Sequence, residues 1–195
     1  MILASASERR IQLLESMGLS FDVRPASIDE TAFRAPTPAL LAERLAEAKA
    51  RHVAERLPAA ESPAVVLAAD TIVVLEGEIF GKPRDRDDAR TMLRRLSGRV
   101  HEVITGIACA HCGDGRHELI GVEHERTRVF FRPLSPERIE WYLATGEPFD
   151  KAGAYGIQGR GAALIERVEG CFFNVVGLPV ARATGMLARA GIDLP

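Results

Sequence analysis

The stretch that decides the fold is Ala64-Val65-Val66-Leu67-Ala68-Ala69, which Asp70 and Thr71 follow directly. A continuous apolar run of this length is typical of a strand buried on both faces of a sheet. We therefore predict a strand over Ala64–Ala69 that ends at Asp70. Ligands of open α/β sheets bind beyond the carboxyl ends of strands, so Asp70 is a candidate to hold Mg²⁺ or to orient a water molecule. The alternative is that Asp70 only caps the turn into Thr71.

On both sides of this strand, patterns typical of strands and helices alternate along the chain. Several strands follow one another in hairpin order, which predicts a mixed sheet with flanking helices rather than a simple Rossmann domain. We expect strands at Phe21–Arg24, Ile72–Leu75, Glu78–Phe80, Val100–Ala110 and His117–Phe131, and helices at Pro38–Leu57, Asp87–Leu96, Pro136–Ala144 and Pro179–Ala190.

The amino-terminal segment combines a short apolar strand, small residues and two adjacent arginines before an amphipathic run. A strand that enters a helix through small residues exposes backbone N–H groups, which attract anions together with the helix dipole. Ser7 is a candidate N-cap whose hydroxyl accepts from the first turn, and Ser5 permits close approach of a ligand. Arg9 and Arg10 could grip a phosphate. The alternative is a capped surface helix with two solvated arginines.

The predicted helix over Pro38–Leu57 carries one lysine in an otherwise apolar row. Leu41, Leu45, Lys49 and Val53 recur every four residues and therefore lie on one face. Lys49 either extends its charge to water along this face or points it into a cleft, where it would bind phosphate.

Two loops add further charges. Asp29 and Glu30 are adjacent in the loop after the second strand, and carboxylates there suit a divalent ion bound to a triphosphate. Lys82 precedes Pro83, which stiffens its backbone. For both loops the alternative is ordinary solvated charge.

The least ordinary stretch runs from Asp150 to Gly161, where four glycines accompany one aromatic ring and one amide. Glycines permit positive φ and close backbone approach. Tyr155 could pack beside a nucleobase, and Gln158 could both donate to and accept from a base edge. The alternative is a turn-rich crossover with a structural tyrosine.

The bulk composition excludes several classes of protein. The chain has 195 residues, and its 47% hydrophobic content argues against disorder. A net charge of −2 predicts no general affinity for nucleic acid or membranes. No apolar run approaches the ~20 residues that span a bilayer, and the apolar start is too short for a signal peptide. We therefore expect a cytoplasmic protein.

Three cysteines, Cys109, Cys112 and Cys171, give an odd count that argues against a disulfide framework. Cys109 and Cys112 have a spacing found in metal and redox sites, but no second pair at finger spacing accompanies them. Gly113-Asp114-Gly115 follows directly and predicts a hairpin turn. We interpret the pair as thiols at a loop tip without a function.

Taken in order, the motifs resemble the Maf family of nucleoside triphosphate pyrophosphatases over nearly the whole chain. The segment Tyr155-Gly156-Ile157-Gln158 resembles the branch that acts on dTTP and UTP, whereas the 7-methyl-GTP branch carries an acidic residue at the glutamine position. Glu8 stands where the family usually has proline. The motifs are Leu3-Ala-Ser-Ala-Ser-Glu-Arg9-Arg10, Ala69-Asp70-Thr71-Ile72-Val73, Gly81-Lys82-Pro83-Arg84-Asp85, Leu96-Ser97-Gly98 and Asp150 to Gly159.

This resemblance implies roles for particular residues. Asp70 matches the family's proton acceptor, and the metal, Mg²⁺ or Mn²⁺, would be held in part by Glu30 and Asp70. The specificity positions correspond to Arg9, Thr71 and Gln158, and the phosphate-binding positions to Ser5, Arg10, Lys49 and Lys82. We expect Glu8 to point outward, because a carboxylate that pointed inward would repel phosphate.

The resemblance also implies a fold and an assembly. It predicts a single domain over residues 1–195, with two lobes around a central cleft as in inosine triphosphate pyrophosphatases, and homodimers are common among such proteins. The predicted reaction converts dTTP or UTP to the nucleoside monophosphate and pyrophosphate. Alternatives are a nucleotide-binding regulator of cell division with incidental hydrolysis, a pyrophosphatase for modified nucleotides such as 7-methyl-GTP, and a zinc or redox module at Cys109 and Cys112.

Overall fold

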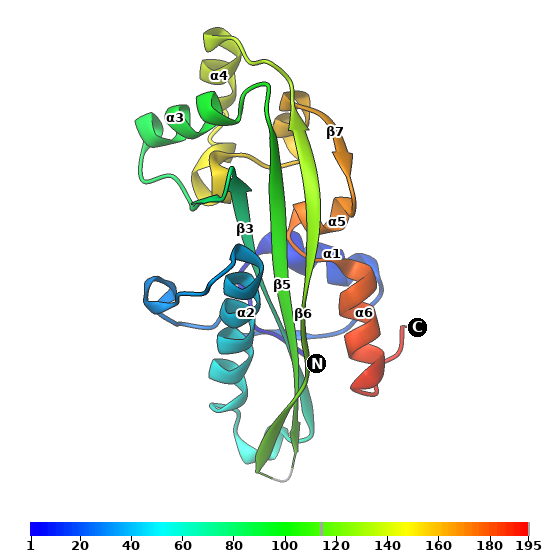
Figure 1. Cartoon of the computed structure of the whole chain (residues 1–195). Coiled ribbons are helices and arrows are strands. Elements are labelled where there is room, and N and C mark those ends of the chain that lie inside the picture. The colour runs from blue at the N-terminus through cyan, green and yellow to red at the C-terminus, as the bar shows by residue number, and fades with distance from the viewer. Residues whose placement is uncertain (114, 195) are drawn as a thin grey trace. The chain divides into compact units, whose positions relative to one another are not determined.

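The computed structural model describes residues 1–113 and 115–194, with the backbone alone described at residue 59. Seven strands form a mixed sheet in the order β2-β1-β3-β5-β6-β7, with β4 paired to β3, and helices flank it (Figure 1). This confirms the predicted mixed α/β fold. The strands are β1 (Ile2–Leu3), β2 (Asp22–Val23), β3 (Ala64–Leu75), β4 (Glu78–Phe80), β5 (Val100–Gly113), β6 (Arg116–Phe131) and β7 (Ile165–Glu169).

Six α-helices and several 3₁₀ turns are described between these strands. Most α-helices start within two residues of the predicted position. The α-helices are α1 (Glu8–Ser16), α2 (Pro38–Ala54), α3 (Arg86–Leu96), α4 (Pro136–Leu143), α5 (Phe172–Val176) and α6 (Val180–Arg189). The 3₁₀ turns are η1 (Glu30–Ala32), η2 (Ala59–Glu61), η3 (Glu147–Asp150), η4 (Ala152–Ala154) and η5 (Gly159–Leu164). No helix among the described residues is long and apolar enough to cross a membrane.

The chain divides into two compact units, which match the two predicted lobes, while the central cleft stays a prediction. The first unit contains residues 1–70, 105–125 and 177–195, and the second contains residues 71–104 and 126–176. The strands β3, β5 and β6 each contribute residues to both units.

The core of the first unit lies between its strands and α2. β1 pairs in parallel with β2 on one side and with β3 on the other, with Leu3 opposite Val23 and Leu67. Small residues on α2 allow the helix to approach the sheet closely. The core cluster consists of Ile2, Ala4, Ala46, Ala50, Val53, Ala54, Val66, Ala68, Ala108 and Cys112.

A glycine on β5 marks the closest approach between α2 and the sheet. A Cβ placed on Gly106 would lie 2.2 Å from the carbonyl oxygen of Ala42 and 2.6 Å from the backbone nitrogen of Glu43. These atoms belong to backbone and cannot rotate away. Gly106 is therefore required for α2 to keep its position against β5.

The strand β6 separates two helices of the first unit. Its His124 Nδ1 lies 2.8 Å from Glu43 Oε1 of α2, whereas Glu123 accepts from Arg189 of α6 at 2.7 Å. Neighbouring residues of a strand point to opposite faces. α2 and α6 therefore cover opposite faces of β6.

The decisive strand is longer than its sequence indicates. β3 runs without a break from Ala64 to Leu75, so the predicted strand end at Asp70 and the predicted turn cap there are both wrong. Asp70 is 7% exposed within the strand. A buried carboxylate is costly unless it is paired, and Lys49 supplies that partner.

In the second unit, β3 continues into β4 through the predicted hairpin. Val73 pairs with Phe80 and Leu75 with Glu78, and both turn residues have positive φ, 53° at Glu76 and 85° at Gly77. This is the pattern of a type I′ turn, which matches the twist of the strands. On the other side β7 pairs antiparallel with β6.

A buried aromatic group forms part of the second unit's core. Tyr155 is 5% exposed, and its hydroxyl lies 2.6 Å from His101 Nε2. The rings of His101, Phe131 and Tyr155 make edge-to-face contacts with centroids 4.7–5.3 Å apart. Burial lowers the pKa of His101 to about 4, so this imidazole is neutral near pH 7.

The hairpin of β5 and β6 confirms the predicted strand order but not the placement of the thiols. Asp114 of the predicted turn lies outside the described residues, whereas β5 extends to Gly113. Cys109 and Cys112 are therefore buried within β5 and do not form a loop tip. Burial raises the pKa of both thiols, that of Cys109 to about 11.

Candidate active site

A lysine that joins two carboxylates forms the centre of the candidate site in the first unit. Lys49 Nζ lies 2.5 Å from Asp70 Oδ1 and 2.6 Å from Glu30 Oε1. The side chains of Lys49 and Asp70 are 13% and 10% exposed, whereas that of Glu30 is 54% exposed. Lys49 therefore points inward, and the interpretation of it as a purely solvated charge is wrong.

Two periodicities bring Lys49 and Asp70 together. Residues Val66, Ala68 and Asp70 alternate along β3 and share one face, and Val66 and Ala68 pack in the same cluster as Ala46 and Ala50 of α2. Asp70 is thus the next position in a row that faces α2. Lys49 borders the alanine stripe of α2 and reaches this row from the side.

The turn η1 presents Glu30 and is held by local hydrogen bonds. Asp29 caps it: its carboxylate accepts from the Thr31 backbone N–H at 3.0 Å and from the Thr31 hydroxyl at 2.6 Å. These bonds from Thr31 lower the pKa of Asp29. Asp29 is therefore a support for the turn, while Glu30 is the carboxylate that faces Lys49.

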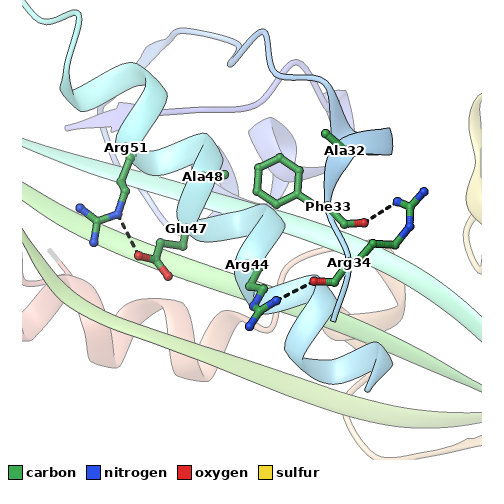
Figure 2. Close-up of a pocket in the computed structure, with 7 residues that line it drawn as sticks. All are labelled: Ala32, Phe33, Arg34, Arg44, Glu47, Ala48 and Arg51. Carbon is green, nitrogen blue, oxygen red and sulfur yellow. Dashed lines mark hydrogen bonds and ion pairs between the residues drawn. The ribbon is translucent and has the colours of Figure 1, made fainter. Parts of the chain in front are cut away.

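A pocket beside η1 shows how this turn is fixed against α2 (Figure 2). Arg44 of α2 donates to the carbonyl oxygen of Arg34 at 2.6 Å, and Arg34 donates to the carbonyl of Phe33 at 2.7 Å. In Figure 2 the three guanidinium groups that line the pocket do not converge on one point. These hydrogen bonds thus hold the segment that carries Glu30 against α2. Its lining consists of Ala32, Phe33, Arg34, Arg44, Glu47, Ala48 and Arg51.

Arg10 is the buried cation of α1. Its Nε donates to the carbonyl oxygen of Gly177 at 2.7 Å, and its Nη1 donates to Ser5 Oγ at 3.0 Å. Burial lowers the pKa of Arg10, and the carboxylates of Asp70 and Glu30 oppose that shift. The structure thereby groups Ser5 and Arg10 with the carboxylates of the first unit.

The start of α1 differs from the prediction in one hydrogen bond. Ser7 occupies the N-cap position but makes no side-chain cap bond; its backbone N–H donates instead to Ser5 Oγ at 3.2 Å. The parallel register of β1 with β3, extended by two residues, brings Ser5 level with Ala69. Glu8 is exposed, as expected for a carboxylate that must not repel phosphate.

Three further predicted site residues belong to the second unit. Thr71 follows Asp70 in β3, and Lys82 is exposed in the segment between β4 and α3. Gln158 is exposed at the N-cap position of η5 and makes no side-chain cap bond. The suggestion that Tyr155 packs beside a base is wrong, because its ring and hydroxyl are used within the core.

Sequence reasoning missed the residues that shape the segment around Gln158. The Tyr142 hydroxyl accepts from the Gly156 N–H at 3.1 Å, and the Glu147 carboxylate accepts from the N–H groups of Arg160 and Gly161 at 3.1 and 3.2 Å. Burial raises the pKa of Tyr142, so its hydroxyl stays protonated. The only sequence signal is the clustering of acidic and glycine residues near position 150.

The donor set around Lys49 suits a divalent cation that takes part of its shell from a substrate. Among residues 1–113 and 115–194, no group of three or more His, Cys, Asp or Glu side chains is placed to hold a metal alone. Asp70 and Glu30 nevertheless converge on one point, the Lys49 ammonium. Mg²⁺ is commonly bound by one or two carboxylates together with substrate phosphates.

The comparisons with known proteins show the family of the chain. A model of the family described as "Maf-like protein" matches residues 1–190, and the chain belongs to this family. The chain is 54% identical over 194 residues to a protein of Symbiobacterium thermophilum, with 100% of the chain and 95% of that protein covered.

Two further relatives are also matched over nearly the whole length of both chains. A protein of Syntrophomonas wolfei is 49% identical, with 98% of each chain covered. A protein of Myxococcus xanthus is 50% identical, with 100% of this chain and 94% of the relative covered. All three relatives carry the name dTTP/UTP pyrophosphatase.

Proposed function

We propose that this protein is a pyrophosphatase that hydrolyses dTTP and UTP to the nucleoside monophosphate and pyrophosphate. The observation that carries the proposal is the contact of Lys49 with both carboxylates: with Asp70 it forms a buried ion pair on a row that otherwise packs as core, and with Glu30 a more exposed one. The names of full-length relatives at 49–54% identity support the substrate.

In the proposed reaction a water molecule attacks the α-phosphorus. The new bond forms between the water oxygen and phosphorus, the bond between phosphorus and the bridging oxygen breaks, and pyrophosphate leaves. Asp70 accepts the proton of the water, since it is the buried carboxylate of the cluster. Positioning and charge stabilisation are the usual means of catalysis at phosphorus.

The cations of the first unit stabilise the phosphate oxygens. Arg10 is held by Ser5 and the Gly177 carbonyl, which fixes its guanidinium before substrate arrives. Lys49 neutralises the carboxylates in the substrate-free protein and turns to the more highly charged triphosphate when it binds. We assign Lys82 the same kind of role.

A divalent cation, Mg²⁺ or Mn²⁺, fits this scheme as the cofactor, and Asp70 and Glu30 would hold it. When bound, it would neutralise charge on the phosphates. When Lys49 turns to the triphosphate, the two carboxylates would be released from it. Their oxygens would then be available to the cation together with oxygens of the triphosphate.

Selection of the base is assigned to Arg9, Thr71 and Gln158. The exposed amide of Gln158 can donate and accept in one plane, which complements the carbonyl and imide N–H of uracil and thymine. We place the reaction in the cytoplasm, with the nucleotide as partner and no nucleic acid, consistent with a net charge of −2. A homodimer is the proposed assembly.

Hydrolysis in ¹⁸O-labelled water tests the bond that breaks. With dTTP or UTP and added Mg²⁺, we expect label in the monophosphate and none in pyrophosphate. Label in pyrophosphate would place the attack at the β-phosphorus, and release of orthophosphate would contradict the proposed products. Tight nucleotide binding without turnover would instead support a regulatory nucleotide-binding protein.

A further inference from the structure

The backbone from Gly156 to Gly161 folds tightly back on itself. A Cβ on Gly161 would lie 2.1 Å from the carbonyl oxygen of Gly156, so the two ends of the segment touch. Gly159 has a φ of 65°, a conformation that other residues rarely adopt. Gln158 lies between these points and is exposed.

Two side chains from outside the segment hold both of its ends. At one end the Tyr142 hydroxyl accepts from the Gly156 N–H at 3.1 Å. At the other end Glu147 Oε1 accepts from the Arg160 N–H at 3.1 Å, and Oε2 accepts from the Gly161 N–H at 3.2 Å. Both carboxylate oxygens of Glu147 are therefore engaged with backbone.

Glu147 is itself held in place on the chain that enters the segment. Its backbone N–H donates to Thr145 Oγ1 at 3.1 Å, and its carbonyl oxygen accepts from Lys151 Nζ at 2.7 Å. A carboxylate that accepts two backbone N–H groups makes charge-assisted bonds, which are stronger than neutral ones. The position of Glu147 therefore determines the position of the backbone at Arg160, two residues after Gln158.

We propose that Glu147 is a positioning residue for base selection, acting through Gln158. This inference rests on the proposed function. Gln158 makes no side-chain cap bond, so the position of its Cα and the direction of its Cα–Cβ bond are determined by the backbone on each side. The anchors at Gly156 and at Arg160 and Gly161 leave that backbone little freedom, and the pyrimidine edge then meets the amide in one orientation.

The test compares Glu147→Gln and Glu147→Ala with the wild type. Glutamine keeps the shape but only one acceptor oxygen, so one backbone N–H loses its partner; alanine removes both. A hydrogen bond to a charged group contributes about 1.5–3 kcal/mol, which corresponds to roughly 10- to 150-fold. We expect the ratio of kcat/KM for UTP to kcat/KM for CTP to decrease by a factor in this range, with the larger decrease in the alanine variant. The decrease should come mainly from a higher KM for UTP.

Glu166→Gln is the matched control, because it removes the same charge from an exposed position of the second unit. We expect this variant to keep the wild-type ratio. If Glu147 were only structural, its variants would lose stability or lose activity on both nucleotides equally, and the ratio would not change. That result would overturn the proposal.

A double-mutant cycle separates positioning from a direct effect. In a Gln158→Ala background, Glu147→Ala should change the UTP-to-CTP ratio no further, since its route to the base is gone. Additive effects on the ratio would contradict the proposal. Amide exchange at Arg160 and Gly161 should accelerate in Glu147→Ala, and unchanged exchange would also contradict it.

The wild-type rates judge the proposed function separately. A wild type that prefers other triphosphates refutes dTTP and UTP as substrates, while the variants still show whether Glu147 controls the preference that exists. A wild type that hydrolyses none overturns both proposals.

Discussion

The candidate site of the first unit and the glycine-rich segment of the second are built in opposite ways. Around Lys49, charged side chains meet one another directly, and the backbone serves as a regular strand and helix. Around Gln158, the backbone itself has the unusual shape, and the side chains of Tyr142 and Glu147 serve to hold it. Charged side chains of a catalytic cluster can therefore be recognised in a sequence individually, whereas a backbone conformation that selects a ligand is indicated only by its glycines.

If the chemistry belongs to the first unit, Asp70→Asn should have the largest effect. The amide keeps the shape but cannot take a proton from water, so we expect kcat to fall by ~10²- to 10⁴-fold, as for other general bases. Circular dichroism and thermal unfolding should show an intact fold. Near-normal turnover by this variant would show that Asp70 is not the proton acceptor and that the cluster around Lys49 does not carry the chemistry.

An acid titration should reveal the buried histidine of the second unit. The pKa of His101 is lowered from 6.5 to about 4 by burial, so between these values the unfolded chain binds a proton that the folded chain does not. Stability should therefore fall as the pH drops through this window, by about 3 kcal/mol in all.

Urea unfolding of wild type and His101→Gln across this range measures that contribution. The variant should lack the additional loss between pH 6.5 and 4. Glu140, whose pKa is lowered from 4.5 to about 2 by hydrogen bonds from Arg90 and Arg86, loses its contribution below about pH 4.5 in both proteins, so it cancels when the two are compared. Parallel pH profiles for the two proteins would contradict the prediction.

Gly106→Ala tests how far the first unit depends on close packing between α2 and β5. The new methyl group would lie 2.2 Å from the Ala42 carbonyl oxygen, so the helix must shift. We expect a loss of about 1–3 kcal/mol in the free energy of unfolding, together with weaker activity, because Lys49 moves with α2.

Gly185→Ala is the matched control on α6 of the same unit, where an added Cβ meets nothing within 4 Å. There alanine should stabilise the helix by up to about 1 kcal/mol. Equal losses in the two variants would show that the contact at Gly106 carries no special weight.

Gln158→Glu tests the selectivity assigned to the second unit. An ionised carboxylate accepts but does not donate, so it matches a base edge that offers only donors, such as the edge of guanine. We expect kcat/KM for dTTP and UTP to fall roughly 5- to 150-fold, and more than any activity on guanine nucleotides. An equal loss on all nucleotides would indicate that Gln158 does not face the base.

The smallest effect is expected at the two thiols of β5. Their raised pKa values and burial make them unreactive, so Cys109→Ala with Cys112→Ala should leave turnover unchanged. Metal analysis of the purified protein provides the check. Bound zinc that disappears together with activity in the double variant would support a metal site instead.

Much of the fold and of the first unit's site could be predicted from sequence, because charged residues in apolar patterns stand out. Lys49 breaks a helical apolar stripe, and Asp70 interrupts an apolar run. The error at Asp70 has a physical reason: a carboxylate suggests a strand end until its partner is known, and that partner lies 21 residues earlier.

The second unit's segment was predictable only in its outline. Its glycines indicate an unusual backbone conformation, but they do not indicate which side chains accept hydrogen bonds from the backbone N–H groups. Tyr142 and Glu147 precede the segment by as many as 14 residues and look like an ordinary helix residue and an ordinary surface acid. The burial of Tyr155 likewise depends on His101, 54 residues away.

The continuity of β3 has a consequence for how this protein can change in evolution. Because strand residues alternate between faces, one inserted residue between Ala64 and Asp70 would turn the carboxylate to the opposite side. Two inserted residues would restore the side but displace the carboxylate by about 6.6 Å, beyond the reach of Lys49. In descendants of this chain the number of residues from the paired start of the strand to Asp70 must therefore stay constant, whereas a change of length in a loop before β3 does not by itself move Asp70 along the strand.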